Sequence, residues 1–292
     1  MQQHDRGGQQ RRPGRCKLRK YCPICVRRSD SPILQVSGWI DNDNVTSVLF
    51  HYFPGQDGGR ALVPIVFGDE SPSGKLREYP LRDVVAARLT RLAPCFSAFT
   101  VAKRPEDYDS SVYFTGNATL EAPTVNMTNL IDYRFFDYFN VTPEFEFGFG
   151  MTFSTFDLGQ LEVKACGRGA AEPTAMTNEL LLDSDANLYD QAYKADVDIT
   201  NTGKTTACQV IQLYVSGPGY GENLRPVKVL RGFEKACLEA GQTKRTEMYL
   251  VNKDLATWNS TRQGWEVKAG EHVVQVGFSS RQLISKTLIE RQ

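Results

Sequence analysis

Apolar and polar residues alternate along the last third of the chain, which is the pattern of strands with one buried face. Val197 and Ile199 alternate with polar neighbours, and Ile211, Leu213 and Val215 repeat the pattern after a glycine-containing turn. Further strands are expected at residues 229–233, 246–250, 265–267 and 273–278. Strands at this spacing over about 100 residues predict an antiparallel β-sandwich of the immunoglobulin-like or fibronectin III-like type.

The N-terminal part of the chain has a different pattern, typical of an α/β layer. Residues 45–53 are β-branched and aromatic and predict a buried strand, which Pro54 and Gly55 end. Residues 58–67 place apolar side chains at helical spacing, although Pro64 interrupts the helix that they predict. A strand, a turn and a helix in this order indicate one unit of an α/β layer.

The charges of the chain balance, with 34 Lys and Arg against 34 Asp and Glu, so net charge indicates neither a nucleic-acid nor a membrane partner. Residues 1–30 nevertheless carry nine basic side chains and two aspartates. We expect this segment to be disordered or artefactual, and RNA or import-receptor binding is the alternative. No apolar run reaches the ~20 residues of a membrane span, and no apolar centre of a secretory signal is visible.

The cysteines give little indication of a metal site, whereas the sequons indicate a secreted ancestry. Cys22 and Cys25 form a C-x-x-C without the second ligand pair of a zinc site, so we expect no metal and no cofactor. Cys208 and Cys237 lie in the sandwich range and are open to pairing. Five Asn-X-Ser/Thr sequons are candidate glycosylation sites: Asn44, Asn117, Asn126, Asn140 and Asn259.

Three blocks of sequence, in order, carry a resemblance to a known family. The first is residues 54–59 (PGQDGG) with residues 67–76 (FGDESPSGKL). The second is residues 132–137 (DYRFFD) with residues 145–150 (FEFGFG), and the third is residues 230–235 (LRGFEK). In this order and spacing the chain resembles the C-terminal half of a family 3 glycoside hydrolase of the fungal β-glucosidase type. The resemblance covers residues 32–76 and 99–292.

The resemblance implies the domain organisation and fold class of the chain. We predict α/β plus all-β: a truncated α/β-sandwich remnant followed by a fibronectin III-like β-sandwich. The expected parts are a basic segment (1–31), the partial α/β domain (32–156), a linker (157–188) and the sandwich (189–292). Residues 77–98 interrupt the family pattern and are expected to be an insertion, either genuine or translated from intron sequence. We expect residues 32–156 to be poorly stable alone, because a stripped sheet exposes its edge, and residues 189–292 to fold alone.

The resemblance also implies the chemistry of the complete enzyme, which is retaining hydrolysis of β-linked glucosides or xylosides. Such hydrolysis needs two carboxyl groups about 5–5.5 Å apart. In the family, the nucleophilic Asp lies in an N-terminal barrel and the acid/base Glu lies upstream of the block at 54–59. We therefore expect no catalytic residue in this chain and no activity alone. The implied partners are a β-linked glucoside or oligosaccharide and a chain carrying the barrel, and the implied location is extracellular. Whether the chain is a genuine short protein or a gene-model fragment stays open.

Carboxylates inside the family blocks are the remaining catalytic candidates, and we expect structural roles for them. They are Asp57, Asp69, Glu70, Asp132 and Asp137. Asp at loop ends commonly accepts hydrogen bonds from backbone N–H groups, and Arg134 is expected to pair with a carboxylate. His51 is expected to be a packed residue rather than a base.

The aromatic side chains between 113 and 149 are expected to pack the junction between the α/β layer and the sandwich. They are Tyr113, Phe114, Tyr133, Phe135, Phe136, Phe145, Phe147 and Phe149. If they instead face solvent, they favour the alternative function, a non-catalytic carbohydrate- or partner-binding β-sandwich module.

Overall fold

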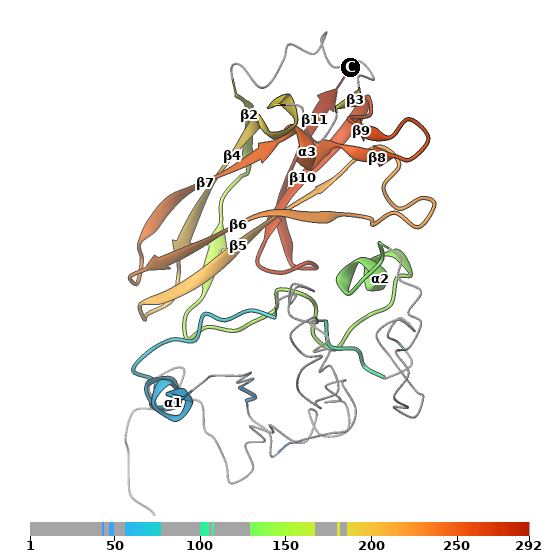
Figure 1. Ribbon diagram of the computed structural model, residues 1–292. Coiled ribbons are helices and arrows are strands. Elements are labelled where there is room, and N and C mark those ends of the chain that lie inside the picture. The colour runs from blue at the N-terminus through green and yellow to red at the C-terminus, as the bar shows by residue number, and fades with distance from the viewer. Residues whose placement is uncertain are drawn as a thin grey trace, which may run out of the picture.

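The fold was obtained as a computed structural model that describes residues 43, 47–49, 56–76, 100–104, 107, 129–166, 180–181 and 186–291. Most of these residues form a sandwich of two antiparallel sheets, with a smaller sheet at one end (Figure 1). In the first sheet β7 (Thr243–Val251) pairs along one edge of β4 (Gln191–Asn201). The short strands β1 (Phe156–Leu158) and β2 (Glu162–Ala165) share the other edge of β4.

The second sheet has the strand order β11-β10-β5-β6. Its strands are β11 (Leu283–Arg291), β10 (Gly270–Gly277), β5 (Ala207–Ser216) and β6 (Val229–Leu238). The small sheet has the order β3-β9-β8. It consists of β3 (Leu180–Leu181), β9 (Gly264–Glu266) and β8 (Thr257–Asn259).

The core lies between the two large sheets, and the alternation in the sequence explains it. Val197 and Ile199 of β4 face Ile211 and Leu213 of β5, and all four side chains are fully buried in one cluster. Their polar neighbours on β4 point to the opposite face, as period-2 strands require. The predicted fibronectin III-like sandwich is therefore confirmed, and so are the strands expected on β4, β5, β6, β7, β9 and β10.

Residues 157–188, expected to be a linker, contain strands instead. β1 and β2 pair with β4 across this range, and Phe156 and Leu161 are buried in the core. Gly159 and Leu161 lie at the break between the two strands, where the main chain turns toward the second sheet. There Ser285 Oγ accepts from the Leu161 N–H at 2.8 Å, and Thr287 Oγ1 donates to the Leu161 carbonyl at 2.7 Å. The sandwich therefore begins at residue 156 rather than 189.

A disulfide joins β5 to β6, so the pairing that the sequence left open is settled. Cys208 and Cys237 occupy directly opposite positions of the two strands and are bonded to each other. Among the described cysteines Cys166 is free. Cys22 and Cys25 lie outside the described residues.

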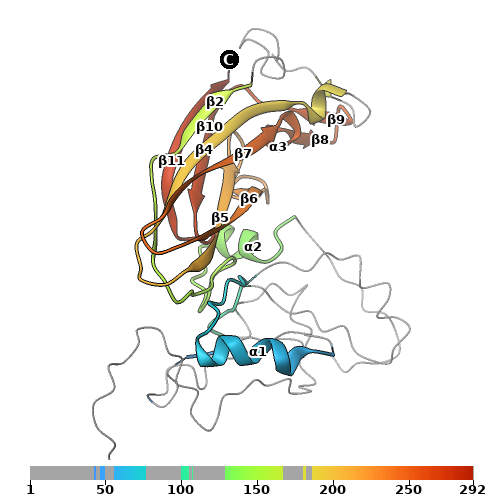
Figure 2. The same ribbon diagram turned by 90° about the vertical axis from the view of Figure 1, so that its left-hand side faces the viewer.

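Four short helices accompany the sheets in the described ranges. The predicted helix α1 (Gly58–Phe67) is confirmed, with Pro64 inside it and Gly68 in the left-handed conformation at its end. The others are α2 (Tyr133–Tyr138), the 3₁₀ helix η4 (Ala186–Tyr189) and α3 (Asn252–Leu255). Figure 2 shows α2 between the sandwich and α1. None of the helices in the described ranges is long and apolar enough to cross a membrane.

The strand expected at 45–53 is mostly outside the described residues. Residues 47–49, the part that is described, are not in a strand. The expected insertion at 77–98 also lies outside the described ranges.

Candidate functional site

Described parts of the three blocks that carry the family resemblance, namely residues 71–76, 132–137 with 145–150, and the start of β6, meet in space, and this junction is the candidate site. Residues 71–76 pair with residues 148–150: the Leu76 N–H donates to the Phe149 carbonyl at 2.9 Å, and the Gly148 N–H donates to the Leu76 carbonyl at 2.7 Å. Lys75 Nζ donates to the Gly150 carbonyl, and burial lowers the pKa of Lys75 to about 8. Two segments separated by about seventy residues of chain are thus held side by side by main-chain hydrogen bonds.

Asp132 fixes the start of α2. The residue is buried and has a left-handed φ of 57°. Its Oδ1 accepts a hydrogen bond of 2.8 Å from the Thr100 N–H. This carboxylate therefore satisfies a buried backbone donor, as expected for Asp at a loop end.

Asp137 fixes the other end of α2 to the sandwich. Its side chain is 8% exposed and forms ion pairs with Lys228, just before β6, and with Arg281 Nε at 3.3 Å. Arg281 Nη2 also donates to the carbonyls of Phe136 (3.1 Å) and Val141 (2.7 Å), so it closes the turn after the helix. Because three groups from distant parts of the chain converge, α2 has a defined position against the sandwich.

Aromatic rings fill the space beneath α2. The Tyr133 ring lies 4.8 Å from the Phe147 ring and 5.9 Å from the Tyr214 ring. The Tyr133 hydroxyl accepts from the Leu230 N–H at 2.9 Å, which connects the second block to the third. The expected packing of aromatic residues at the junction is confirmed for Tyr133 and Phe147, and Phe136 is buried as well.

Gln212 of β5 joins the loop at 145–150 to Phe278, which directly follows β10. Its Nε2 donates to the Gly148 carbonyl at 3.2 Å and to the Phe278 carbonyl at 2.9 Å, while the Tyr214 hydroxyl donates to its Oε1 at 2.6 Å. Burial raises the pKa of Tyr214, so the phenol stays a neutral donor. Gly148 has a φ of 79°, and a Cβ there would lie 2.3 Å from the Gln212 amide. The glycine is therefore required by both backbone and space.

In the part of the chain that is described, the carboxylates of the central block have structural partners. Asp132 and Asp137 hold α2, and Glu146 Oε1 accepts from Ser279 Oγ at 2.7 Å. Asp57, at the start of α1, and the pair Asp69 and Glu70, after its end, are exposed. The backbone N–H groups of Asp69 and Glu70 donate to the Pro64 carbonyl and form the turn that follows α1.

Other candidates have structural positions or lie outside the described residues. His272 is buried in β10, with Nε2 3.0 Å from the Lys268 carbonyl oxygen. The Arg134 guanidinium lies 5.7 Å from the centre of the Tyr133 ring, and its carboxylate partner stays a prediction. His51, Tyr113 and Phe114 are among the residues that the structure leaves undescribed.

Sequence reasoning missed Lys228, Arg281 and Gln212, which contribute most of the polar contacts at the junction. Lys228 lies 91 residues from Asp137 in the chain, and Arg281 lies 144 residues from it. No local pattern marks a long-range ion pair or a buried amide, so only contact information could have identified these residues.

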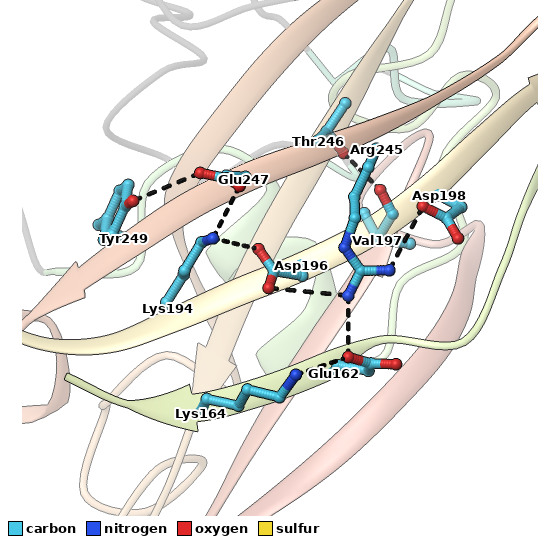
Figure 3. Close-up of polar contacts among 10 residues, drawn as sticks. All are labelled: Glu162, Lys164, Lys194, Asp196, Val197, Asp198, Arg245, Thr246, Glu247 and Tyr249. Atoms are coloured by element: carbon cyan, nitrogen blue, oxygen red, sulfur yellow. Dashed lines mark hydrogen bonds and ion pairs between the residues drawn. The ribbon is translucent and has the colours of Figure 1, made fainter.

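A second polar cluster covers the outer face of the first sheet (Figure 3). Glu162, Asp196 and Glu247 lie directly opposite one another on β2, β4 and β7, which places three carboxylates in one row. Like charges in such a row repel. Lys194 compensates from one side, at 3.3 Å from Asp196 and 2.7 Å from Glu247, and Arg245 compensates from the other, at 2.8 Å from Glu162.

These contacts lower the pKa values of Glu162 and Glu247. Hydrogen bonds from Lys164 and Arg245 lower the pKa of Glu162, and a hydrogen bond from Lys194 lowers that of Glu247. The described residues contain no group of three or more His, Cys, Asp or Glu side chains placed to hold a metal ion. Lys194 and Arg245 place positive charge beside all three carboxylates of this row.

Comparison with known families places the junction in a family context. A profile described as "Glycosyl hydrolase family 3 C-terminal domain" matches residues 23–153, and a "Fibronectin type III-like domain" profile matches residues 209–280. The chain carries the C-terminal domain of glycosyl hydrolase family 3. The family 3 match begins at residue 23, so it takes in the last part of the segment 1–31 that we expected to lie outside the family.

Relatives and solved structures agree with this assignment. "Probable beta-glucosidase M" of Aspergillus fumigatus is 35% identical over 269 residues, which is 91% of this chain and 31% of that protein. "Probable beta-glucosidase D" of Emericella nidulans is 32% identical over 248 residues, which is 85% and 27% of the two chains. The structure of the "Beta-D-glucoside glucohydrolase" of Trichoderma reesei matches with a TM-score of 0.63 and 30% identity, over 81% of this chain and 29% of that one. The chain thus spans less than a third of the length of each of these three proteins.

Proposed function

We propose that this chain supplies the C-terminal portion of a β-glucosidase-like glycoside hydrolase acting on a β-linked glucoside or oligosaccharide. The observation that carries the proposal is the meeting of the three family blocks at one junction, where residues 71–76, residues 132–150 and the start of β6 hold one another. The similar fungal proteins are named as β-glucosidases, which supports the same substrate class.

A chimera tests this function. The segment of the Aspergillus fumigatus relative that aligns with this chain would be replaced by this chain, and hydrolysis of an aryl β-glucoside would be measured. Because the junction holds its blocks through contacts within this chain, we expect a folded, active chimera. A chimera that folds by circular dichroism and gel filtration but has no activity contradicts the proposal.

We further propose that the chain does not hydrolyse glucosides alone. Retaining hydrolysis needs two carboxyl groups about 5–5.5 Å apart, and the carboxylates of the central block are already engaged with Thr100, Lys228, Arg281 and Ser279. The purified chain is therefore expected to leave an aryl β-glucoside intact. Turnover above a buffer control, lost on Asp137→Asn substitution, would overturn this part of the proposal.

An extracellular location is also part of the proposal, since disulfides such as Cys208–Cys237 form in oxidising compartments.

Of the two described sequons, Asn140 is exposed after α2, whereas the Asn259 carboxamide forms hydrogen bonds with Thr261, Arg262 and Glu266. We expect a glycan on Asn140 and none on Asn259. Intact mass of the chain secreted from yeast should lose one glycan in Asn140→Gln and none in Asn259→Gln, and the reverse pattern contradicts the assignment. Asn44, Asn117 and Asn126 lie outside the described residues.

A further inference from the structure

α3, β8 and β9 meet at the end of the sandwich that lies away from α1 (Figures 1 and 2). Four side chains lie in contact there. Trp258 and Trp265 are directly opposite on β8 and β9, with ring centres 5.5 Å apart and nearly perpendicular planes. Lys253 of α3 places Nζ 4.8 Å from the Trp265 ring centre and 4.9 Å from that of Tyr189. The same Nζ donates to the Tyr189 hydroxyl at 2.9 Å. We call these four residues the aromatic end.

Two of these rings are presented to solvent although their positions are fixed. Tyr189 is 54% exposed and Trp258 is 41% exposed. Large aromatic side chains are usually buried to a greater extent, so rings that are exposed and held in place indicate a binding surface. Because Lys253 and the Trp258–Trp265 pair already restrict the rings, a ligand would lose little free energy in ordering them.

The groups around the rings indicate the chemistry of the ligand. The Tyr189 hydroxyl lies at the edge of its ring, the Lys253 ammonium lies over the Tyr189 and Trp265 rings, and Glu266 accepts from Asn259 Nδ2 at 3.0 Å beside Trp265. Flat apolar faces bordered by hydrogen-bonding groups match a ligand with apolar faces and polar edges. A β-linked glucosyl ring is such a ligand, because its equatorial hydroxyls lie at the edge and its axial C–H groups cover both faces. Two exposed aliphatic side chains, which would favour a protein partner, lie away from this end: Val63 is on α1, and Leu224 is beside Tyr138 of α2.

We propose that Tyr189, Trp258 and Lys253 form a non-catalytic binding surface for β-glucan chains at the aromatic end of the sandwich. The inference rests on the proposed function, which supplies the class of ligand. It adds a second contact with the polymer, separate from the bond that is hydrolysed. A glucan held there would keep the chain, and any domain joined to it, close to its substrate.

Tryptophan fluorescence can test the proposal directly, because two of the three tryptophans of the chain belong to the aromatic end. The purified full chain would be titrated with cellohexaose and with laminarihexaose, and run by affinity electrophoresis in gels containing hydroxyethyl cellulose. We expect a saturable fluorescence change with at least one hexasaccharide and retarded migration in the gel. Trp258→Ala and Tyr189→Ala should each weaken binding by about tenfold or more.

Phe233→Ala is the matched control, since Phe233 is an aromatic residue of the same sandwich that is 70% exposed on β6, outside the aromatic end. This variant should bind like the unsubstituted chain. Lys253→Met keeps the apolar stem and removes the charge, so it should weaken binding without altering the thermal midpoint of a folded chain. If Trp258→Ala disturbs the β8–β9 hairpin, Tyr189→Ala on the neighbouring 3₁₀ helix still decides the question.

Two results would overturn the proposal: no saturable binding of either hexasaccharide, or equal weakening by Phe233→Ala and Trp258→Ala. Failure here is distinguishable from failure of the proposed function, because the chimera assay uses a soluble aryl glucoside and needs no polymer. An active chimera together with a chain that binds no glucan would refute the aromatic end alone.

Discussion

The ion pairs of Asp137 are the most direct target for mutation, because they connect α2 to two separate parts of the sandwich. In Asp137→Asn the side chain keeps its volume but loses its charge, leaving Lys228 (11% exposed) and Arg281 (29% exposed) without this partner. Breaking a buried ion pair on one side costs roughly 3–5 kcal/mol. Water can reach Arg281, so we reduce the expected loss in unfolding free energy to about 2–4 kcal/mol.

This loss converts to a measurable change in thermal stability. Unfolding entropy is about 2.1 cal/mol/K per residue, which gives about 0.3 kcal/mol/K for a unit of roughly 150 residues. The thermal midpoint of Asp137→Asn is therefore expected to fall by about 7–13 °C in differential scanning calorimetry. Asp157→Asn, on the exposed face of β1, is the control and should change the midpoint by less than about 2 °C.

A double-mutant cycle separates the ion pair from other effects of the substitution. Lys228→Met removes the facing charge and keeps most of the apolar stem. If the pair acts as described, the double variant should be more stable than the sum of the two single losses predicts, by about 1 kcal/mol or more. The reasoning is refuted if Asp137→Asn melts with the Asp157→Asn control, or if the two single losses are additive.

Three further predictions concern Gly148, the carboxylate row and the disulfide. Gly148→Ala should lower the urea-unfolding free energy by about 2–3 kcal/mol, whereas Gly241→Ala, at a similar φ of 78° but with open space around it, should cost about 1 kcal/mol; equal losses would contradict the close contact with Gln212. The pKa values of Glu162 and Glu247 are lowered in the folded chain, so their contribution to stability is present above the unfolded carboxyl pKa. This contribution is lost as the pH falls below about 4.5 and through the folded pKa values. The thermal midpoint of Arg245→Gln should therefore depend less on pH in this range than the midpoint of the unsubstituted chain does. Replacing Cys208 and Cys237 together by alanine should cost about 3–4 kcal/mol for a loop of 29 residues, and a reductant should then have no effect on the variant's urea midpoint, in contrast to the unsubstituted chain.

The strands that could be predicted from the sequence are those of the sandwich that have one strongly apolar face. Strands with mixed faces were missed: β11 points Ser285 and Thr287 toward Leu161 and buries Ile289, while Ile284 and Leu288 are exposed, so its apolar residues lie on both faces. β1 and β2 were missed because each is short and the chain turns between them at Gly159. Side-chain hydrogen bonds to the Leu161 main chain replace apolar packing there, and period-2 patterns do not detect such bonds.

The candidate site was predicted in part. The family blocks identified Tyr133, Asp137 and Phe147, and the expected structural role of the aspartates agrees with their contacts. The partners Lys228 and Arg281 come from distant segments, so their role depends on the folded topology. The same holds for the aromatic end, where Tyr189 and Trp258 are 69 residues apart and no spacing rule relates them.

Hydrogen–deuterium exchange of the full chain tests the central claim most directly, namely that residues 129–150 belong to the sandwich unit. The N–H groups of Leu230 and Ser280 donate to Tyr133 and Phe147, so both sides of the junction should open together. We predict that peptides covering α2 and residues 145–150 exchange as slowly as peptides from β5 and β10. Asp137→Asn should accelerate exchange in both α2 and residues 145–150. Rapid exchange of residues 129–150 beside fully protected β5 and β10 would contradict the account.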